Sequence, residues 1–138
     1  MIGAAKMMSK WNADICLELH FNSIGHEQNA YGSEMLVLKG DDDSAKIGYN
    51  FIDELSTQFK TRRRGRYKTD ESQQLVGVKP VKSGDRGHYN LNKVKKAGIP
   101  IRLLMEPFFA GTKTRESEQF IQDPQKYSRV LGKLLGEL

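Results

Sequence analysis

His20 and Glu106 are the two residues whose types and positions best suit chemistry. His20 ends an alternating run, CLELH, and Glu106 interrupts an apolar run, LLMEPFF. Imidazole binds transition metals, and a carboxylate is costly to bury without a partner. A metal-bound water beside a carboxylate is a standard arrangement for hydrolysing an amide, because the metal acidifies the water and the carboxylate moves its proton. The alternative reading is structural: an exposed or paired strand-end histidine and a paired buried glutamate.

The strands expected at 14–21 and 99–109 position these two residues near their ends. In the first strand, alternation places Ile15, Leu17, Leu19 and Phe21 on one face and Cys16, Glu18 and His20 on the other. Functional residues of α/β sheets gather where strands end. We therefore expect His20 and Glu106 to meet in one cleft although they are far apart in the sequence.

The remaining pattern alternates helices with strands. Helices are expected at 2–11, 44–61, 89–96 and 117–122 and from Pro124 to Leu135, and further strands at 31–39 and 75–78. Such alternation predicts a three-layer α/β/α domain with a mostly parallel, twisted sheet. The length of 138 residues predicts one domain, residues 1–138.

Composition predicts an ordinary globular protein, with 38% hydrophobic and 28% charged residues. No apolar run approaches the roughly 20 residues of a membrane span. The first residues do not resemble a signal peptide, so we expect cytoplasmic synthesis without an export signal of the chain's own. The single cysteine, Cys16, excludes an internal disulfide and a Cys-rich zinc cage. We expect it to be a core residue.

The net charge of +5 suits an anionic partner, either nucleic acid or a bacterial cell wall with anionic polymers. The run TRRRGRYK at 61–68 concentrates this charge. We expect it to be a solvated loop, with contact to the wall or another polyanion as the functional alternative. Nucleic-acid binding, with Tyr67 and Tyr89 as its aromatic residues, is a weaker alternative because the chain has no recognised nucleic-acid motif.

Three runs in order resemble the zinc-dependent N-acetylmuramoyl-L-alanine amidases of the Amidase_3 type: NADICLELHFNS, YGSEMLVL and IPIRLLMEPFF. Gly77-Val78-Lys79 is similar to the family's Arg-Gly-Val-Lys segment without the Arg, and FIQDPQKYSRVLGKLLGEL is similar to its C-terminal helical end. The resemblance covers essentially the whole chain. It implies a phosphorylase/hydrolase-like fold and cleavage of the amide between N-acetylmuramic acid and L-alanine in peptidoglycan.

The resemblance also implies roles for individual residues. His20 matches a zinc ligand, and Glu106 matches the catalytic glutamate beside the metal. Asn22 follows the ligand as the family's Asn does and is expected to shape the loop. Glu34 matches the Gly-x-Glu position, where orienting its neighbours is the simpler role. Both are also candidates for substrate binding.

The chain departs from the family at its start. Family members begin with a strand ending in Asp-x-Gly-His-Gly and a helix that supplies a glutamate ligand, and neither is found in this sequence. His26 and His88, both expected in loops, are candidates for substitute ligands or substrate contacts. Zinc normally takes three protein ligands, so His20 alone does not suffice.

Three explanations of this departure stay open. The chain is the C-terminal part of a longer enzyme, an upstream segment or second chain supplies the missing ligands, or a shortened protein keeps the scaffold without the chemistry. The last would be a catalytically inactive wall-binding or regulatory protein. For an active enzyme without a leader, a phage-type lysin (endolysin) or prophage product that reaches the wall after release is expected.

Overall fold

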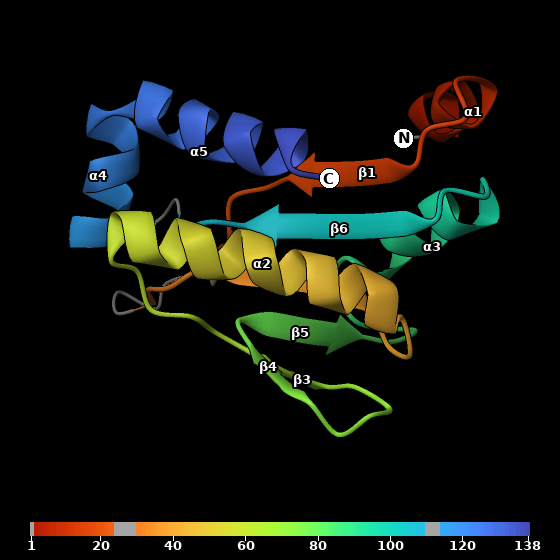
Figure 1. Ribbon diagram of the computed structural model, residues 1–138, viewed down its shortest axis with the longest axis horizontal. Helices are drawn as coiled ribbons and strands as arrows, with labels where there is room; N and C mark the ends of the chain where they lie inside the picture. Colours follow the sequence, from red (N-terminus) through yellow and green to blue (C-terminus); the bar gives the residue numbers. More distant parts are fainter. Residues whose placement is uncertain (1, 24–29, 110–113) are drawn as a thin grey trace.

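The computed structural model describes residues 2–23, 30–109 and 114–138 (Figure 1). Its elements are α1 (Ile2–Lys10), β1 (Ile15–Leu19), β2 (Glu34–Leu38), α2 (Asp42–Phe59), β3 (Arg66–Lys68), β4 (Gln74–Val76), β5 (Val78–Val81), α3 (His88–Lys96), β6 (Ile101–Glu106), α4 (Arg115–Gln122) and α5 (Pro124–Gly136). Each helix predicted from the sequence is present, with ends that differ by at most two residues.

The main sheet has the strand order β1-β6-β2-β5. β1 runs parallel to β6 and β2 runs parallel to β5, whereas β2 and β6 are antiparallel. The prediction of a mostly parallel sheet is therefore confirmed. Because of the one antiparallel pair, β1 and β6 finish at the same end of the sheet at which β2 and β5 begin. This end is called the site edge below.

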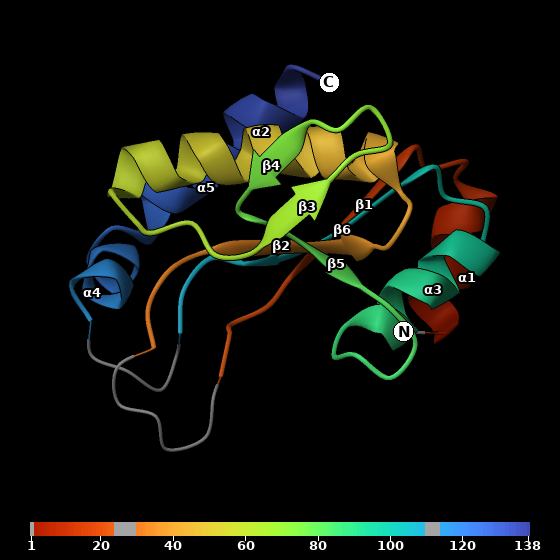
Figure 2. The same cartoon turned by 90° about the horizontal axis from the view of Figure 1, so that it is seen from below.

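Helices cover both faces of the sheet, which confirms the three-layer architecture. α2 and α5 lie on one face, and α1 and α3 lie on the other (Figures 1 and 2). Leu91 of α3 packs with Leu36 of β2 and Leu104 of β6. Cys16 is buried nearby with Val94, as the sequence predicted for the cysteine.

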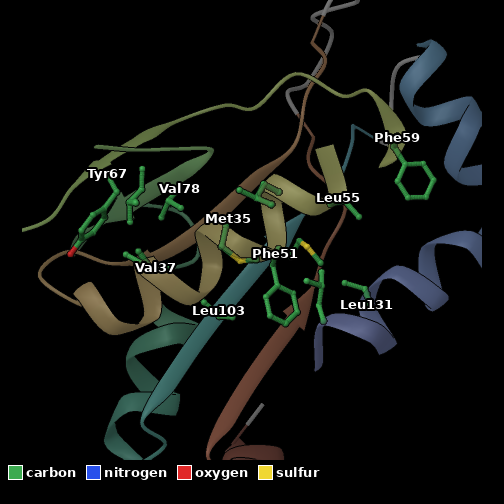
Figure 3. Close-up of a cluster of buried hydrophobic side chains, with 14 of the residues drawn as sticks. Met35, Val37, Phe51, Leu55, Phe59, Tyr67, Val78, Leu103 and Leu131 are labelled. Atoms are coloured by element: carbon green, nitrogen blue, oxygen red, sulfur yellow. The ribbon is translucent and has the colours of Figure 1, made fainter. Parts of the chain in front are cut away.

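The larger core lies between α2, α5 and the sheet (Figure 3). Phe51, Leu55 and Phe59 recur every four residues along α2 and are all buried, because this spacing brings them to one side of the helix. They pack in one cluster with Met35 of β2 and Leu103 of β6.

The helix ends agree with local sequence signals. Asp41 caps α2 by accepting a hydrogen bond from the Ser44 amide at 3.3 Å, and Lys60 ends the helix in a left-handed conformation. Asp123 caps α5, whose first residue is Pro124. Within the residues that the structure describes, no helix is long and apolar enough to cross a bilayer.

Three sequence predictions need correction. The basic run at 61–68 is not only loop, because Arg66–Lys68 forms β3 and pairs with β4. The strand predicted at 75–78 is two strands, β4 and β5, which turn at Gly77, and only β5 joins the main sheet. His88 is the first residue of α3 instead of a loop residue. Short strands of three or four residues carry too little alternation to be recognised in a sequence.

Candidate active site at the ends of two parallel strands

His20 and Glu106 lie at neighbouring positions on one face of the sheet. In the β1–β6 register Glu18 pairs with Leu104, and the His20 amide donates to the Met105 carbonyl at 2.9 Å. Side chains two residues apart on a strand share a face, so His20 follows Glu18, and Glu106 follows Leu104. This face is the one that α3 covers. Both residues stand at the site edge.

A carboxylate holds the His20 ring. His20 Nε2 lies 3.1 Å from Glu18 Oε2, and Asn90 Nδ2 of α3 donates to the same oxygen at 3.1 Å. The His20 side chain is 40% exposed, whereas that of Glu18 is 11% exposed. A carboxylate beside a histidine fixes the orientation of the ring. The ring is therefore oriented by its own strand and by α3 while it remains open to solvent.

Glu106 is a buried acid in contact with a second buried acid. It pairs with Glu34 in the β2–β6 register, and the Glu34 carboxyl group is close enough to act on its pKa. Burial, and then the contact with Glu34, raise the pKa of Glu106 above its ordinary value, although Arg86 and Lys79 act in the opposite direction. The Arg86 guanidinium lies 3.3 Å from Glu106 Oε1. A carboxyl group with a raised pKa holds a proton more readily than an ordinary carboxylate, which suits it to accept a proton and return it.

Glu34 is held by a ring of polar groups. Asn22 Nδ2 donates to its Oε1 at 2.7 Å, and the Asn22 amide donates to the Phe108 carbonyl. Lys79 Nζ lies 3.9 Å from Glu34 Oε1, and Arg64 Nε lies 4.0 Å from Oε2. Asn22 thus ties the segment after β1 to the carboxyl pair. Direct contact of Asn22 or Glu34 with substrate stays a prediction.

The antiparallel pairing of β2 with β6 creates this carboxyl pair. Glu34 begins β2, whereas Glu106 ends β6. In an all-parallel sheet the beginning of β2 would lie at the opposite end from Glu106. His20 and Glu106 therefore lie where strands end, as expected. Glu34 lies at the start of its strand, which the sequence did not predict.

The described residues do not complete a catalytic zinc site by themselves. Such a site takes three protein ligands and one open position. Among residues 2–23, 30–109 and 114–138, no group of three His, Cys, Asp or Glu side chains is arranged to hold a metal ion. His26 lies outside the described residues. His88 begins α3, where the preceding Gly87 lies against Leu36 and Leu104. The role predicted for either histidine is untested.

Sequence reasoning did not assign roles to Glu18, Arg86 or Arg64 in this site. Glu18 could have been found, because alternation already placed it on the face of His20. Lys79 was noted as part of a Gly-Val-Lys segment without a role. Arg86 had no such signal, since its approach to Glu106 depends on the path of the chain between β5 and α3.

Comparison with known proteins identifies the fold. No protein-family model matches the chain, and no curated protein matches its sequence. A protein from Neisseria meningitidis assigned as an N-acetylmuramoyl-L-alanine amidase superposes with a TM-score of 0.66 at 17% identity, over 99% of this chain and 63% of its own. The CwlD amidase of Clostridioides difficile was solved in complex with the GerS lipoprotein. It superposes with a TM-score of 0.62 at 18% identity, over 99% of this chain and 62% of its own.

A third structure agrees with these two. The catalytic domain of the CD27L endolysin, which targets Clostridia difficile, gives a TM-score of 0.55 at 21% identity, over 86% of this chain and 54% of its own. The chain therefore has the fold of amidases. It spans less than two thirds of the length of each of these three structures.

Proposed function

We propose that this chain contributes to a peptidoglycan amidase that cleaves the amide bond between N-acetylmuramic acid and L-alanine. The single observation that carries the proposal is the placement of His20 and Glu106 at neighbouring positions on one face, where two parallel strands end. The amidase fold of the structural neighbours supports it. We also propose that residues 1–138 form one amidase-like domain that lacks the N-terminal strand and helix of the Amidase_3 type.

Glu106 is the proposed general base and acid. Its buried carboxyl group accepts a proton from the attacking water and returns it to the leaving amine of L-alanine. Glu34 is the cross-strand neighbour of Glu106, and Arg86 lies 3.3 Å from Glu106 Oε1. These two neighbours act oppositely on the Glu106 pKa, since Glu34 raises it and Arg86 lowers it. The proton can therefore be held and released on the same group.

His20 is the proposed contribution of this chain to a zinc site. When bound, zinc would acidify a water and polarise the amide carbonyl. Because the described residues do not supply three ligands, the proposal places the other donors on an upstream segment or on a second chain. Glu18 would orient His20 as a partner of the ligand.

The substrate bond is tested by product analysis. The protein is tagged at its C-terminus at its own locus, so that any upstream segment or bound chain is retained, and is incubated with purified peptidoglycan. We expect new L-alanine amino termini and intact glycan chains. The Glu106→Gln variant should release them roughly 10²–10⁴-fold more slowly, because it keeps the shape but cannot carry the proton. Cleavage of a different bond, or equal rates in both proteins, would overturn the assignment.

A catalytically inactive wall-binding or regulatory protein is the second candidate. It is favoured by the hydrogen bond of His20 to Glu18 and by the incomplete ligand set among the described residues. Binding to peptidoglycan without any release of amino termini would support it. Salt-sensitive binding to DNA without binding to peptidoglycan would instead favour a nucleic-acid-binding protein.

For the active enzyme, we propose a phage-type lysin or prophage product that acts after release, in keeping with the endolysin among the structural neighbours.

A further inference from the structure

A pocket of about 540 Å³ is lined by the segment that joins α2 to β3, together with Tyr31 and Val76. Four arginines and one tyrosine dominate its lining: Arg62, Arg63, Arg64, Arg66 and Tyr31. These arginines come from the basic run whose simplest interpretation in the sequence was a solvated loop. The structure gives them a defined position instead.

Backbone pairing fixes this arginine loop against the segment before β2. The Ser33 amide donates to the Arg62 carbonyl at 2.7 Å, and the Arg64 amide donates to the Ser33 carbonyl at 2.8 Å. Gly32 has a φ of +109°, and a Cβ at this position would lie 2.7 Å from the Arg62 carbonyl oxygen. The close approach therefore requires glycine here. A loop held in this way presents its side chains in fixed directions.

Aromatic rings orient two of the guanidinium groups. Arg62 lies over the Tyr31 ring at 5.4 Å from its centroid and donates to the Tyr31 hydroxyl at 3.0 Å. Arg64 lies over the Phe109 ring at 4.7 Å. Such contacts pre-organise arginine for an anion and reduce the entropy lost on binding. Since both rings carry guanidinium groups, they do not form a shared platform for stacked bases, which argues against nucleic acid.

The pocket has an excess of positive charge, and one of its arginines reaches towards the proposed centre. Arg63 pairs with Asp53, but Arg66 has no acidic partner within the described part of the chain. Arg64 Nε lies 4.0 Å from Glu34, the neighbour of Glu106. A molecule that is cleaved at Glu106 can therefore extend an anionic group towards these arginines.

We propose that this arginine pocket binds a carboxylate of the peptide that carries the cleaved L-alanine. The inference rests on the proposed function and names the part of the substrate that this surface recognises. Guanidinium groups pair with carboxylates through parallel hydrogen bonds, which gives both affinity and orientation. A concave pocket next to the reacting groups suits a short acidic peptide better than a long polyanion, which would need an extended basic track.

The test is calorimetric binding of an N-acetylmuramoyl dipeptide whose second residue has a free carboxylate, compared with the same compound amidated at that carboxylate. Glu106→Gln protein prevents turnover. We expect the free carboxylate to bind roughly tenfold more tightly, as one charge-assisted pairing provides. The Arg62→Gln/Arg66→Gln double variant should lose this difference.

The matched control is Lys95→Gln/Lys96→Gln, which removes the same charge from exposed positions in the last turn of α3, before β6 begins. It should keep the tenfold difference. Equal binding of the two compounds, or equal losses in both double variants, would overturn the proposal. The proposal would also be overturned if the arginine double variant bound teichoic acid or duplex DNA more weakly than the wild type but bound both dipeptide compounds as the wild type does. The binding measurement does not require hydrolysis. A negative binding result therefore does not affect the cleavage assay, and a negative cleavage assay does not affect the binding result.

Discussion

The Glu34–Glu106 pair places two acids side by side in a buried position, and each has different neighbours. Asn22 donates to Glu34, whereas Arg86 approaches Glu106. Two adjacent carboxyl groups cannot both ionise easily, so a proton held between them is favoured. Arg86 and Lys79 limit this effect because they favour the ionised form of Glu106. Burial and the Glu34 contact therefore favour the protonated form of Glu106 at the end of β6 more than in an ordinary carboxyl group.

The raised pKa of Glu106 has a consequence for stability. Because the folded-state pKa lies above the unfolded value, the carboxyl group favours folding fully below the unfolded pKa, and this contribution is lost as pH rises through the folded pKa. Glu106→Gln stays neutral at every pH. We therefore expect the melting temperature of Glu106→Gln to exceed that of the wild type increasingly from mildly acidic to neutral pH, and the difference to vanish in strong acid.

Melting curves across this pH range measure the effect. Glu118→Gln, at an exposed position of α4, is the control and should follow the wild type. A difference between Glu106→Gln and wild type that does not change with pH would contradict a raised pKa at Glu106.

For single residues, the sequence predicted the face of the sheet on which a side chain lies better than it predicted the partners of that side chain. Alternation correctly placed Glu18 with His20 and opposite Leu17. It could not predict that Asn90 of α3 would donate to the same Glu18 oxygen that contacts the His20 ring, because that contact depends on how α3 packs on the sheet. The arginine pocket could not be predicted from the sequence either, since a basic run has the same composition whether it is solvated or held against Tyr31.

Among the elements, α2 determines how closely the helical layer approaches the sheet. Gly48 faces the sheet, and a Cβ there would lie 2.7 Å from Met35 Cγ and 3.1 Å from Leu103 Cδ2. The missing side chain therefore lets α2 sit low on β2 and β6. This packing supports the strands that present Glu34 and Glu106.

Gly48→Ala tests this packing. Alanine improves helix propensity by about 1 kcal/mol, but overpacking a core typically costs about 1–3 kcal/mol. We expect net destabilisation in denaturant unfolding. Gly132→Ala in α5 is the matched control, because its Cβ would have no neighbour within 4 Å. It should stabilise the protein by about 0.5–1 kcal/mol. Equal shifts in both variants would contradict close packing at Gly48.

Long periodic elements were predictable and short ones were not. The four-residue spacing of Phe51, Leu55 and Phe59 defined α2 from the sequence alone. β3 lies in a basic, polar stretch and pairs with β4 in a separate two-stranded sheet, whereas β4 overlaps the strand predicted at 75–78. Nothing in the sequence of β3 distinguishes a strand from a loop, because its pairing partner, not its own periodicity, decides its conformation.

For the whole molecule, the relative direction of the strands decides which residues form the site, and the number of layers does not. Alternating helices and strands correctly predicted three layers and a mostly parallel sheet. The antiparallel contact of β2 with β6 could not be predicted, since strand order depends on long-range packing. That contact brings Glu34 to Glu106 and places the loop of Arg64 next to them. The proposed site and the proposed peptide pocket both depend on it.

β1 is the outermost strand of the described sheet on one side, and Leu19 and Phe21 at its end are 53% and 60% exposed. The sequence alternation placed these side chains on one face with Leu17, and Leu17 packs against the larger core. The expectation that another segment or chain completes the zinc ligands stays a proposal for the whole protein.

The most direct test of the central claim compares amide hydrolysis by His20→Ala, Glu106→Gln and the double variant, using the tagged protein from its own host. If the imidazole and the carboxyl group serve one reaction centre, each single change should reduce the rate by at least about a hundredfold, and the double change should reduce it no further, because residues that act as a unit are not additive. Losses that multiply in the double variant, or full activity in either single variant, would show that these two groups do not form one centre.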